Sequence, residues 1–220
     1  MQSSDYPVLI TEIKFASPSR GTLRQSQNPT EIAKLMIQGG ASAISVLTQP
    51  HLFNGSPEYF IKVRQAVNAP LLMKDIIINR VQIDAAHKMG ADIILLIQGI
   101  FDSNLVSGQD DLINYAHSLG LLVLLEVHTE QELNRASKTG TDLIGINNRN
   151  LDNMLIDLNT SCKLLKNFEK SCPIISESGI ESSSDILQLR QCGSDAFLVG
   201  SSIMISNDIQ ASVERLVKSF

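Results

Sequence analysis

The chain has 220 residues, of which 43% are apolar and 19% charged, and its formal net charge at pH 7 is −5. This composition is that of an ordinary globular protein and excludes disordered and fibrous classes. The negative charge argues against nucleic acid or an anionic membrane as a partner, and no apolar run approaches the ~18 residues of a membrane span.

Short apolar runs alternate along the chain with segments of helical period. The expected strands, in chain order, are Val8–Ile13, Ala43–Leu47, Leu71–Lys74, Asp92–Ile97, Leu121–Val127, Leu143–Ile146, Ile174–Ser176 and Ala196–Val199. Helices are predicted between them, including Pro29–Gln38, Ser56–Val67, Val81–Met89, Glu130–Lys138 and Ser182–Gln191. The runs IILLI and LLVLLEV are continuously apolar, which is typical of parallel strands covered on both faces.

The connections between these elements repeat. A triplet close to Gly-Ala-Asp precedes the second, fourth, sixth and eighth predicted strands, which indicates a repeating strand–helix unit. Eight strands, each followed by a helix, favour an α/β fold with a single (β/α)8 TIM barrel formed by residues 1–220. A doubly wound open sheet is the alternative, but the chain carries neither GxGxxG nor a Walker A sequence.

The cysteines and the N-terminus bear on the cellular environment. Cys162, Cys172 and Cys192 form no CxxC pair, so we interpret them as reduced thiols and not as a disulfide framework or a zinc site. The first residues lack the basic region and cleavage site of a signal peptide. These features predict a cytoplasmic protein without a structural metal.

In a barrel of this type the active site lies at the carboxyl ends of the strands. Six of the eight predicted strands end there in acids, bases, amides or Gly-Ser pairs. They are Glu12 with Lys14, Lys74, Glu126, Asn147 with Arg149, Glu177 with Ser178 and Gly179, and Gly200 with Ser201. A single charge at a strand end is usually only a solvated residue, but six such ends at one rim favour a functional site.

These residue types suit an anionic substrate. Lys14, Lys74 and Arg149 would supply positive charge, and the glutamates among them would pair with the cations and tune their pKa values. A lysine crowded by another cation would lose its proton readily and act as a general acid near neutrality. The Ser-Gly and Gly-Ser turns follow the last two strands, where barrels commonly bind phosphate through backbone N–H groups.

Several longer segments carry a resemblance. They are EIKFASPSRG (12–21), SVLTQPHLFNGS (45–56), LLMKD (71–75), GADIILLI (90–97), LLEVHTEQEL (125–133), IGINNRNL (144–151), SESGI (176–180) and FLVGSS (197–202). In this order and over nearly the whole chain, they resemble the indole-3-glycerol-phosphate synthase family. The resemblance implies a carboxy-lyase of tryptophan biosynthesis that needs no cofactor or metal. Its reaction converts 1-(2-carboxyphenylamino)-1-deoxyribulose 5-phosphate to indole-3-glycerol phosphate, with release of CO2 and water.

The resemblance also implies residue roles. Lys74 matches the general acid and Glu126 the acid/base of the dehydration, while Lys14 matches a lysine that contacts the anionic substrate and shares proton transfer. Glu12 and Asn147 match orienting residues. The expected binding residues are Ser17 and Arg149 for the substrate carboxylate, Phe53 for its ring, Ser178, Gly179, Gly200 and Ser201 for phosphate, and Glu177 as a supporting carboxylate.

The chain departs from the family pattern at two places. Ile76 stands where the family usually has phenylalanine, and only about seven residues precede the first strand, so the family's N-terminal helical extension is expected to be largely absent. We interpret His51, His87 and His117 as surface or helix-packing residues, and we favour a structural role for His128 over a substrate contact.

Two other functions are weighed against this resemblance. A phosphosugar isomerase such as phosphoribosylanthranilate isomerase would end its first strand in cysteine and its sixth in aspartate, where this chain has Glu12 and Asn147. A non-catalytic barrel subunit is the other alternative. The sequence leaves open whether the chain is a monomer or associates with another enzyme of the pathway.

Overall fold

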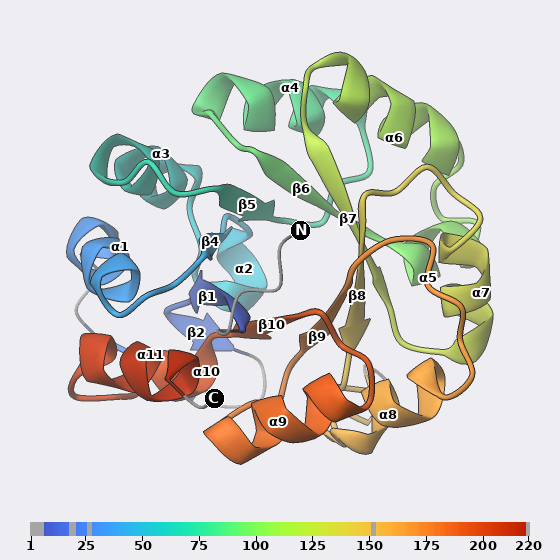
Figure 1. The fold of residues 1–220 in the computed structure, drawn as a ribbon. Coiled ribbons are helices and arrows are strands. Elements are labelled where there is room, and N and C mark those ends of the chain that lie inside the picture. The colour runs from blue at the N-terminus through green and yellow to red at the C-terminus, as the bar shows by residue number, and fades with distance from the viewer. Residues whose placement is uncertain (1–6, 18–20, 26–27, 151–152, 219–220) are drawn as a thin grey trace.

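The computed structural model describes residues 7–17, 21–25, 28–150 and 153–218. Within them, eight parallel strands close into a barrel in the order β1-β10-β9-β8-β7-β6-β5-β4 (Figure 1). The strands are β1 (Val8–Ile13), β4 (Ala43–Leu47), β5 (Leu71–Lys74), β6 (Ile93–Ile97), β7 (Leu122–Val127), β8 (Leu143–Asn147), β9 (Ile174–Glu177) and β10 (Ala196–Val199). The predicted barrel is confirmed, and no predicted strand boundary differs from the observed one by more than one residue.

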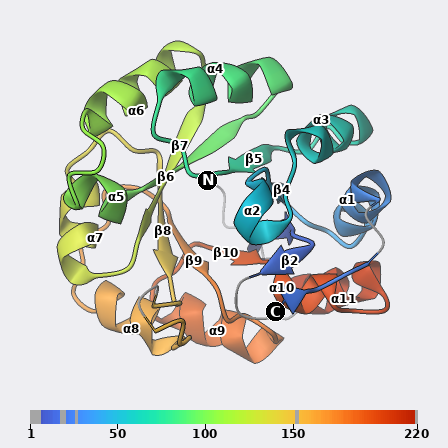
Figure 2. The ribbon, with the colours of Figure 1, turned by 180° about the vertical axis from the view of Figure 1, so that it is seen from behind.

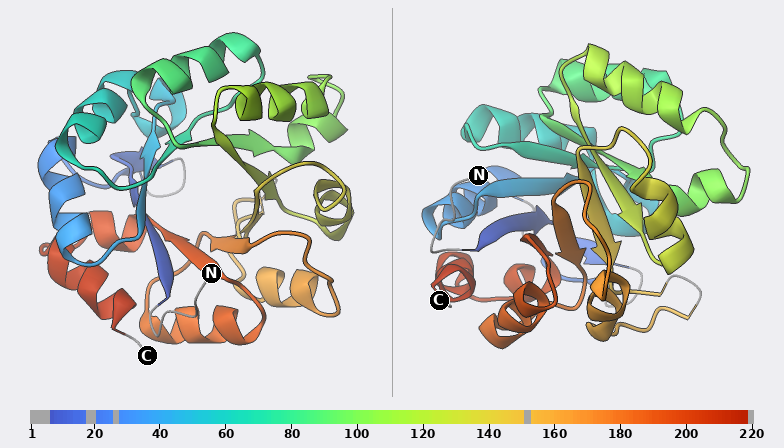
Figure 3. Two further views of the ribbon diagram at one scale, coloured as in Figure 1. Left: turned by 45° about the horizontal axis from the view of Figure 1, so that its top comes forward. Right: turned by 45° about the vertical axis from the view of Figure 1, so that its right-hand side comes forward.

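Helices surround the barrel on its outer side (Figures 2 and 3). The longer ones are α1 (Pro29–Gln38), α3 (Pro57–Ala66), α4 (Arg80–Met89), α6 (Gln109–Ser118), α7 (Glu130–Ala136), α8 (Asn159–Leu165), α9 (Ser183–Gln191) and α11 (Ile209–Val217). Short helices α2 (Pro50–Phe53), α5 (Gln98–Asp102) and α10 (Ser201–Met204) follow β4, β6 and β10, and a small hairpin of β2 (Ala16–Ser17) and β3 (Gly21–Thr22) follows β1. The sequence did not predict this hairpin. None of the helices in the described part of the chain has the length and apolar character needed to span a bilayer.

The hydrophobic core has two parts because each barrel strand is buried on both faces. One cluster fills the barrel interior and includes Ile10, Leu72, Leu124, Ile175 and Leu198. A larger cluster lies between the strands and the surrounding helices. Each of the five interior residues named lies two positions before a residue of the predicted site, so strand alternation places that site directly above the apolar filling.

We call the amino ends of the barrel strands the lower rim and their carboxyl ends the upper rim. At the lower rim, the repeated aspartates Asp92, Asp142 and Asp195 accept the backbone N–H of a neighbouring strand, from Leu71, Val123 and Ile174 respectively, each at 2.8 Å. Each also pairs with a cationic or titratable side chain, at 2.9 Å to Arg64, 2.8 Å to His117 and 2.7 Å to Lys170. The repeated triplet is therefore explained by this recurring contact between adjacent strands.

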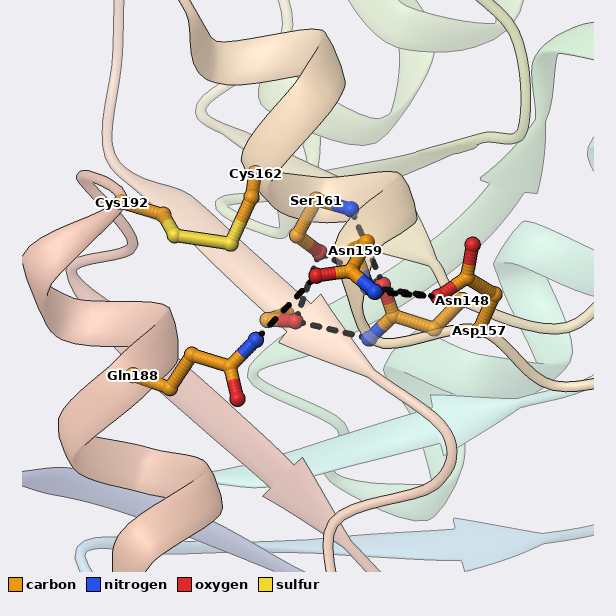
Figure 4. Close-up of a disulfide and its surroundings, with 8 residues drawn as sticks. Asn148, Asp157, Asn159, Ser161, Cys162, Gln188 and Cys192 are labelled. Atoms are coloured by element: carbon orange, nitrogen blue, oxygen red, sulfur yellow. Dashed lines mark hydrogen bonds between the residues drawn. A yellow bond between two sulfur atoms is a disulfide. The ribbon is translucent and has the colours of Figure 1, made fainter.

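The structure contradicts the prediction that all three cysteines are reduced. Cys162 of α8 and Cys192, which follows α9, form a disulfide with 4.9 Å between their Cα atoms (Figure 4), and Cys172 is free. The two halves of the bridge come from consecutive strand–helix units, 30 residues apart. Because they meet only when α8 and α9 pack in the helical layer, their spacing carries no local sequence signature.

Candidate active site

A cavity of about 360 Å³ opens at the upper rim. Its lining contains every residue that the sequence assigned to the site. They are Glu12, Lys14, Ser17, Phe53, Lys74, Glu126, Asn147, Arg149, Glu177, Ser178, Gly179, Gly200 and Ser201. Residues from all parts of the chain are thus brought together at one mouth, as the alternation of inward-facing side chains predicted. Two parts of the quoted segments, residues 18–20 and Leu151, lie outside the described residues.

An ionic cluster forms the floor of this cavity. The Lys74 ammonium donates to Glu177 and lies 3.6 Å from Oε2 of Glu126 and 3.7 Å from Oε1 of Glu12. Nζ of Lys14 pairs with Oε2 of Glu12 at 2.6 Å. The side chains of the three glutamates are only 4%, 6% and 1% exposed for Glu12, Glu126 and Glu177. Such buried charges cost desolvation energy, so their retention points to chemistry more than to stability.

The surroundings of Lys74 differ from those the sequence suggested. We expected a neighbouring cation to lower its pKa, but three carboxylates surround it. Burial lowers the pKa of Lys74, and the attraction of Glu177, Glu12 and Glu126 outweighs burial and leaves that pKa well above the usual lysine range. Lys74 therefore holds its proton firmly at neutral pH, and that part of the prediction is wrong.

The three carboxyl groups are not equivalent. Burial raises the pKa of Glu126, but His128, Lys74 and a hydrogen bond from Asn147 outweigh it and lower that pKa to about 2. Burial likewise opposes ionisation of Glu12, and Lys14 with Lys74 brings its pKa below the usual value. For Glu177, burial and the nearby carboxylates raise the pKa despite the contact with Lys74. Glu177 is thus the carboxyl group of the cluster that gains a proton most easily.

Two glycines make room for these carboxylates. A Cβ at Gly145 of β8 would overlap Oε1 of Glu177, and one at Gly200 would lie 2.7 Å from Oε2 of Glu12. Gly200 was expected to let phosphate approach the backbone, and the structure adds this steric role. Gly145 was not identified from the sequence, although a glycine inside a strand is the signal of such a close approach.

The turn after β9 is held by a buried amide. Ser178 and Gly179 both have left-handed backbone angles, with φ of 69° and 84°. Nδ2 of Asn148 donates to the Ser178 carbonyl at 3.2 Å, and its Oδ1 accepts from the Ser161 hydroxyl at 2.8 Å (Figure 4). The Ser202 hydroxyl donates to the Ile180 carbonyl at 3.0 Å and so joins the turns after β9 and β10. Sequence reasoning missed Asn148, which adjoins the expected Asn147.

The walls of the cavity come from the loops. Phe53 ends α2, and Ile76, the departure from the family pattern, lines the same cavity and is 37% exposed. Arg149 donates its backbone N–H to Oδ1 of Asn147 and its guanidinium to the Met154 carbonyl. Among the described residues, no group of three or more His, Cys, Asp or Glu side chains is arranged to hold a metal ion.

Comparison with known proteins identifies the family. The sequence model of the family described as indole-3-glycerol phosphate synthase matches residues 1–216. The chain belongs to this family. The indole-3-glycerol phosphate synthase of Campylobacter curvus is 41% identical over 208 residues, which are 94% of this chain and 78% of that protein. The synthase of Legionella pneumophila (strain Paris) is 40% identical over 217 residues, 99% of this chain and 83% of that protein.

Similar solved structures share the fold alone. A thiamine phosphate pyrophosphorylase from Pyrococcus furiosus superimposes with a TM-score of 0.70 at 19% identity, over 96% of this chain and 93% of that one. The N-acetylmannosamine-6-phosphate 2-epimerase of Clostridium perfringens superimposes with a TM-score of 0.65 at 17% sequence identity, over 88% of this chain and 86% of that one. Membership of the synthase family rests on sequence, and it makes the chain a carboxy-lyase of tryptophan biosynthesis in preference to the isomerase and scaffold alternatives.

Proposed function

We propose that the ionic cluster at the upper rim carries out ring closure, decarboxylation and dehydration of 1-(2-carboxyphenylamino)-1-deoxyribulose 5-phosphate, with Lys74 as general acid and Glu126 as the acid/base of the dehydration. The observation that carries this proposal is the Lys74 ammonium, fixed among three carboxylates on the floor of the cavity. No cofactor or metal is needed, and residues 1–220 act as one catalytic domain.

Ring closure forms a bond between the aromatic carbon that bears the carboxylate and the carbonyl carbon of the substrate. The carbonyl π electrons move to oxygen, which becomes an alkoxide and takes a proton. Lys74 can donate that proton even with a raised pKa, because an alkoxide is more basic than an amine. Before the transfer, the fixed ammonium stabilises the developing negative charge on oxygen.

Decarboxylation and dehydration follow from the same arrangement. The bond to the carboxylate breaks, its electron pair restores the aromatic ring, and CO2 leaves. The new hydroxyl then takes a second proton and leaves as water, while the adjacent carbon gives its proton to Glu126. Lys14 can supply the second proton directly, and Lys74 can supply it after regaining from solvent the proton that it gave to the alkoxide. The two ammonium groups lie 2.6 and 3.7 Å from Glu12.

The remaining residues hold the two anionic ends of the substrate. In this proposal the turns after β9 and β10 bind the phosphate, and Ser17 with Arg149 binds the carboxylate. Phe53 packs on the substrate ring. The residues of the phosphate site are Ser178, Gly179, Gly200 and Ser201, and the orienting residues are Glu12, Asn147 and Glu177. Binding at both ends places the aromatic carbon against the carbonyl and lowers the entropic cost of ring closure.

Indole fluorescence during incubation with the substrate tests the proposal. Lys74→Ala should lower kcat by about a thousandfold or more, since it removes both the acid and the fixed charge. Lys88→Ala, on the exposed side of α4, is the matched control and should keep the parent rate. Glu126→Gln should also lose most of kcat. A Lys74→Ala enzyme with the parent rate would remove Lys74 from the chemistry.

A further inference from the structure

His128 lies between two carboxylates beside the active site. It follows the end of β7, and its Nε2 is 3.2 Å from Oε1 of Glu126. On the other side of the ring, Nδ1 is 3.3 Å from Oε2 of Glu132 on α7, and the same oxygen accepts the backbone N–H of His128 at 2.8 Å. The Nδ1 contact is a hydrogen bond, whereas the Nε2 contact is an ion-pair distance without hydrogen-bond geometry. Carboxylate oxygens carry only lone pairs, so a ring that lies between two of them is attracted to both only when both of its nitrogens carry protons.

A protonated imidazole supplies a third positive charge to a cluster of three buried carboxylates and two lysines. Glu12 has its closest cation in Lys14, and Glu177 has its closest in Lys74. For Glu126 the closest cationic group is the His128 ring, because Lys74 is 3.6 Å away and already engaged. With His128 neutral, three ionised carboxylates would face two lysines in a desolvated site, and charge balance would require a proton on Glu177.

His128 does not line the substrate cavity, and its side chain is only 12% exposed. Its influence on a substrate must therefore pass through Glu126. Oε1 of that carboxylate also accepts from Nδ2 of Asn147 at 3.1 Å. Oε1 thus accepts a hydrogen bond from Asn147 and lies at ion-pair distance from His128, and Oε2 faces Lys74.

We propose that His128 is a positioning residue which, as an imidazolium fixed by Glu132, keeps the Glu126 carboxylate ionised and oriented toward the substrate. The inference rests on the proposed role of Glu126. The charged groups that act on the ring are Glu126 from β7 and Glu132 from α7. Burial lowers the pKa of His128, but the close contacts with these two carboxylates outweigh burial and raise that pKa to about 9.

Nitrogen-15 NMR of the parent enzyme, labelled at its histidines, tests the charge state of the His128 ring in the intact protein. The His128 resonance is assigned by its disappearance in His128→Gln. Both ring nitrogens should be protonated at neutral pH, with a titration midpoint near 9. The midpoint should fall in Glu132→Gln, because the amide keeps the acceptor oxygen and removes the negative charge. A ring that is neutral at pH 7 would overturn the proposal.

Kinetics test the consequence for Glu126. His128→Gln should lower kcat by about tenfold or more and raise the acidic limb of the kcat–pH profile by about one pH unit, because the Glu126 pKa rises. KM should stay within about twofold, since His128 lies outside the cavity lining. The matched control is His117→Gln, which alters another histidine–carboxylate pair, with Asp142, at the lower rim. The His117→Gln variant should keep the kcat and the kcat–pH profile of the parent enzyme.

Glu126→Gln separates the two proposals. If it keeps the parent kcat, the proposed role of Glu126 fails and this inference fails with it. If Glu126→Gln is inactive while His128→Gln keeps kcat and the acidic limb, only the role of His128 is overturned. If His128→Gln does not fold, Glu132→Gln decides the kinetic question by the same limb shift. The histidine resonance whose midpoint falls in Glu132→Gln then assigns His128 in the parent spectrum, and the parent titration decides its charge.

Discussion

The two rims of the barrel use carboxylates in different ways. At the lower rim, Asp142 and Asp195 have side chains 30% and 40% exposed, and each holds a backbone N–H of a neighbouring strand. At the upper rim, the side chains of Glu126 and Glu177 are 6% and 1% exposed. Within the described residues, the recorded partners of these upper carboxylates are side chains of Lys74, His128 and Asn147.

This difference separates structure from chemistry. A carboxylate that holds a strand N–H cannot change partners without disturbing the sheet, whereas one whose partners are side chains can exchange them as substrate charge arrives. The lower aspartates gain charge-assisted hydrogen bonds while still partly solvated. The upper glutamates carry the desolvation cost of a buried cluster. The lower rim should therefore govern stability and the upper rim activity.

Among variants that leave every catalytic side chain in place, Gly145→Ala should give the largest effect, because its Cβ would overlap Oε1 of Glu177 and displace the carboxylate next to Lys74. We expect kcat to fall by about a hundredfold to a thousandfold, the range for loss of one preorganised polar group. Steady-state kinetics by indole fluorescence would measure it. Gly140→Ala is the control, because its Cβ would meet Ile113 at an ordinary 3.8 Å. Equal rates in the two variants would refute the steric argument.

The disulfide tests whether the helices around the barrel contribute to stability but not to activity. Cys162 and Cys192 close a segment with a sequence separation of 30, so Cys162→Ser with Cys192→Ser should lower the free energy of unfolding by roughly 3–4 kcal/mol on the chain-entropy account. Neither residue lines the cavity, so kcat should hold. Urea unfolding of the oxidised parent, the reduced parent and the variant measures the effect. Cys172→Ser should behave as the parent, and a fully reduced parent by thiol titration would contradict the bridge.

The protonated His128 ring at the upper rim should stabilise the fold to an extent that depends on pH. Its pKa rises from 6.5 to about 9 on folding, so its stabilisation is full below pH 6.5 and disappears as pH rises through about 9. We expect His128→Gln to be less stable than the parent by roughly 2–3 kcal/mol at pH 6, with the difference vanishing above the folded pKa. Urea unfolding of both proteins across this range checks the sign. A difference that grows with pH would show that the imidazole is neutral in the fold.

The sequence was sufficient for the fold and for placing the residues of the ionic cluster at one cavity, because both depend on local pattern. Apolar runs marked the strands, and residues two apart, such as Glu12 and Lys14, had to share a face. Since all parallel strands present their carboxyl ends at one rim, residues distant in the chain could be placed together without any knowledge of their distances.

What the sequence could not supply depends on side-chain geometry across strands. The high pKa of Lys74 requires that three glutamates from three other strands turn toward it, and no spacing within the chain encodes that. His128 was set aside because it lies two residues after Glu126, just beyond the strand end, and the strand pattern carries no sign of Glu132 on α7, which contacts the other side of its ring. The bridge between Cys162 and Cys192 likewise arises from packing of two helices.

Asp142→Asn should give the smallest effect and the sharpest contrast between the rims. The amide oxygen can still accept the Val123 N–H, so the loss is limited to the charge and to the contact with His117. We expect a fall of about 1 kcal/mol in the free energy of unfolding, as for a partly exposed charge-assisted pair, with kcat unchanged.

Glu177→Gln is the matched upper-rim variant, and it should lose activity without a comparable loss of stability, because it removes a buried carboxylate from a crowded cluster. Urea unfolding and indole fluorescence on the same preparations measure both quantities. An Asp142→Asn enzyme that is as stable as the parent but slower would show that the lower rim also shapes the active site, and the division between the rims would fail.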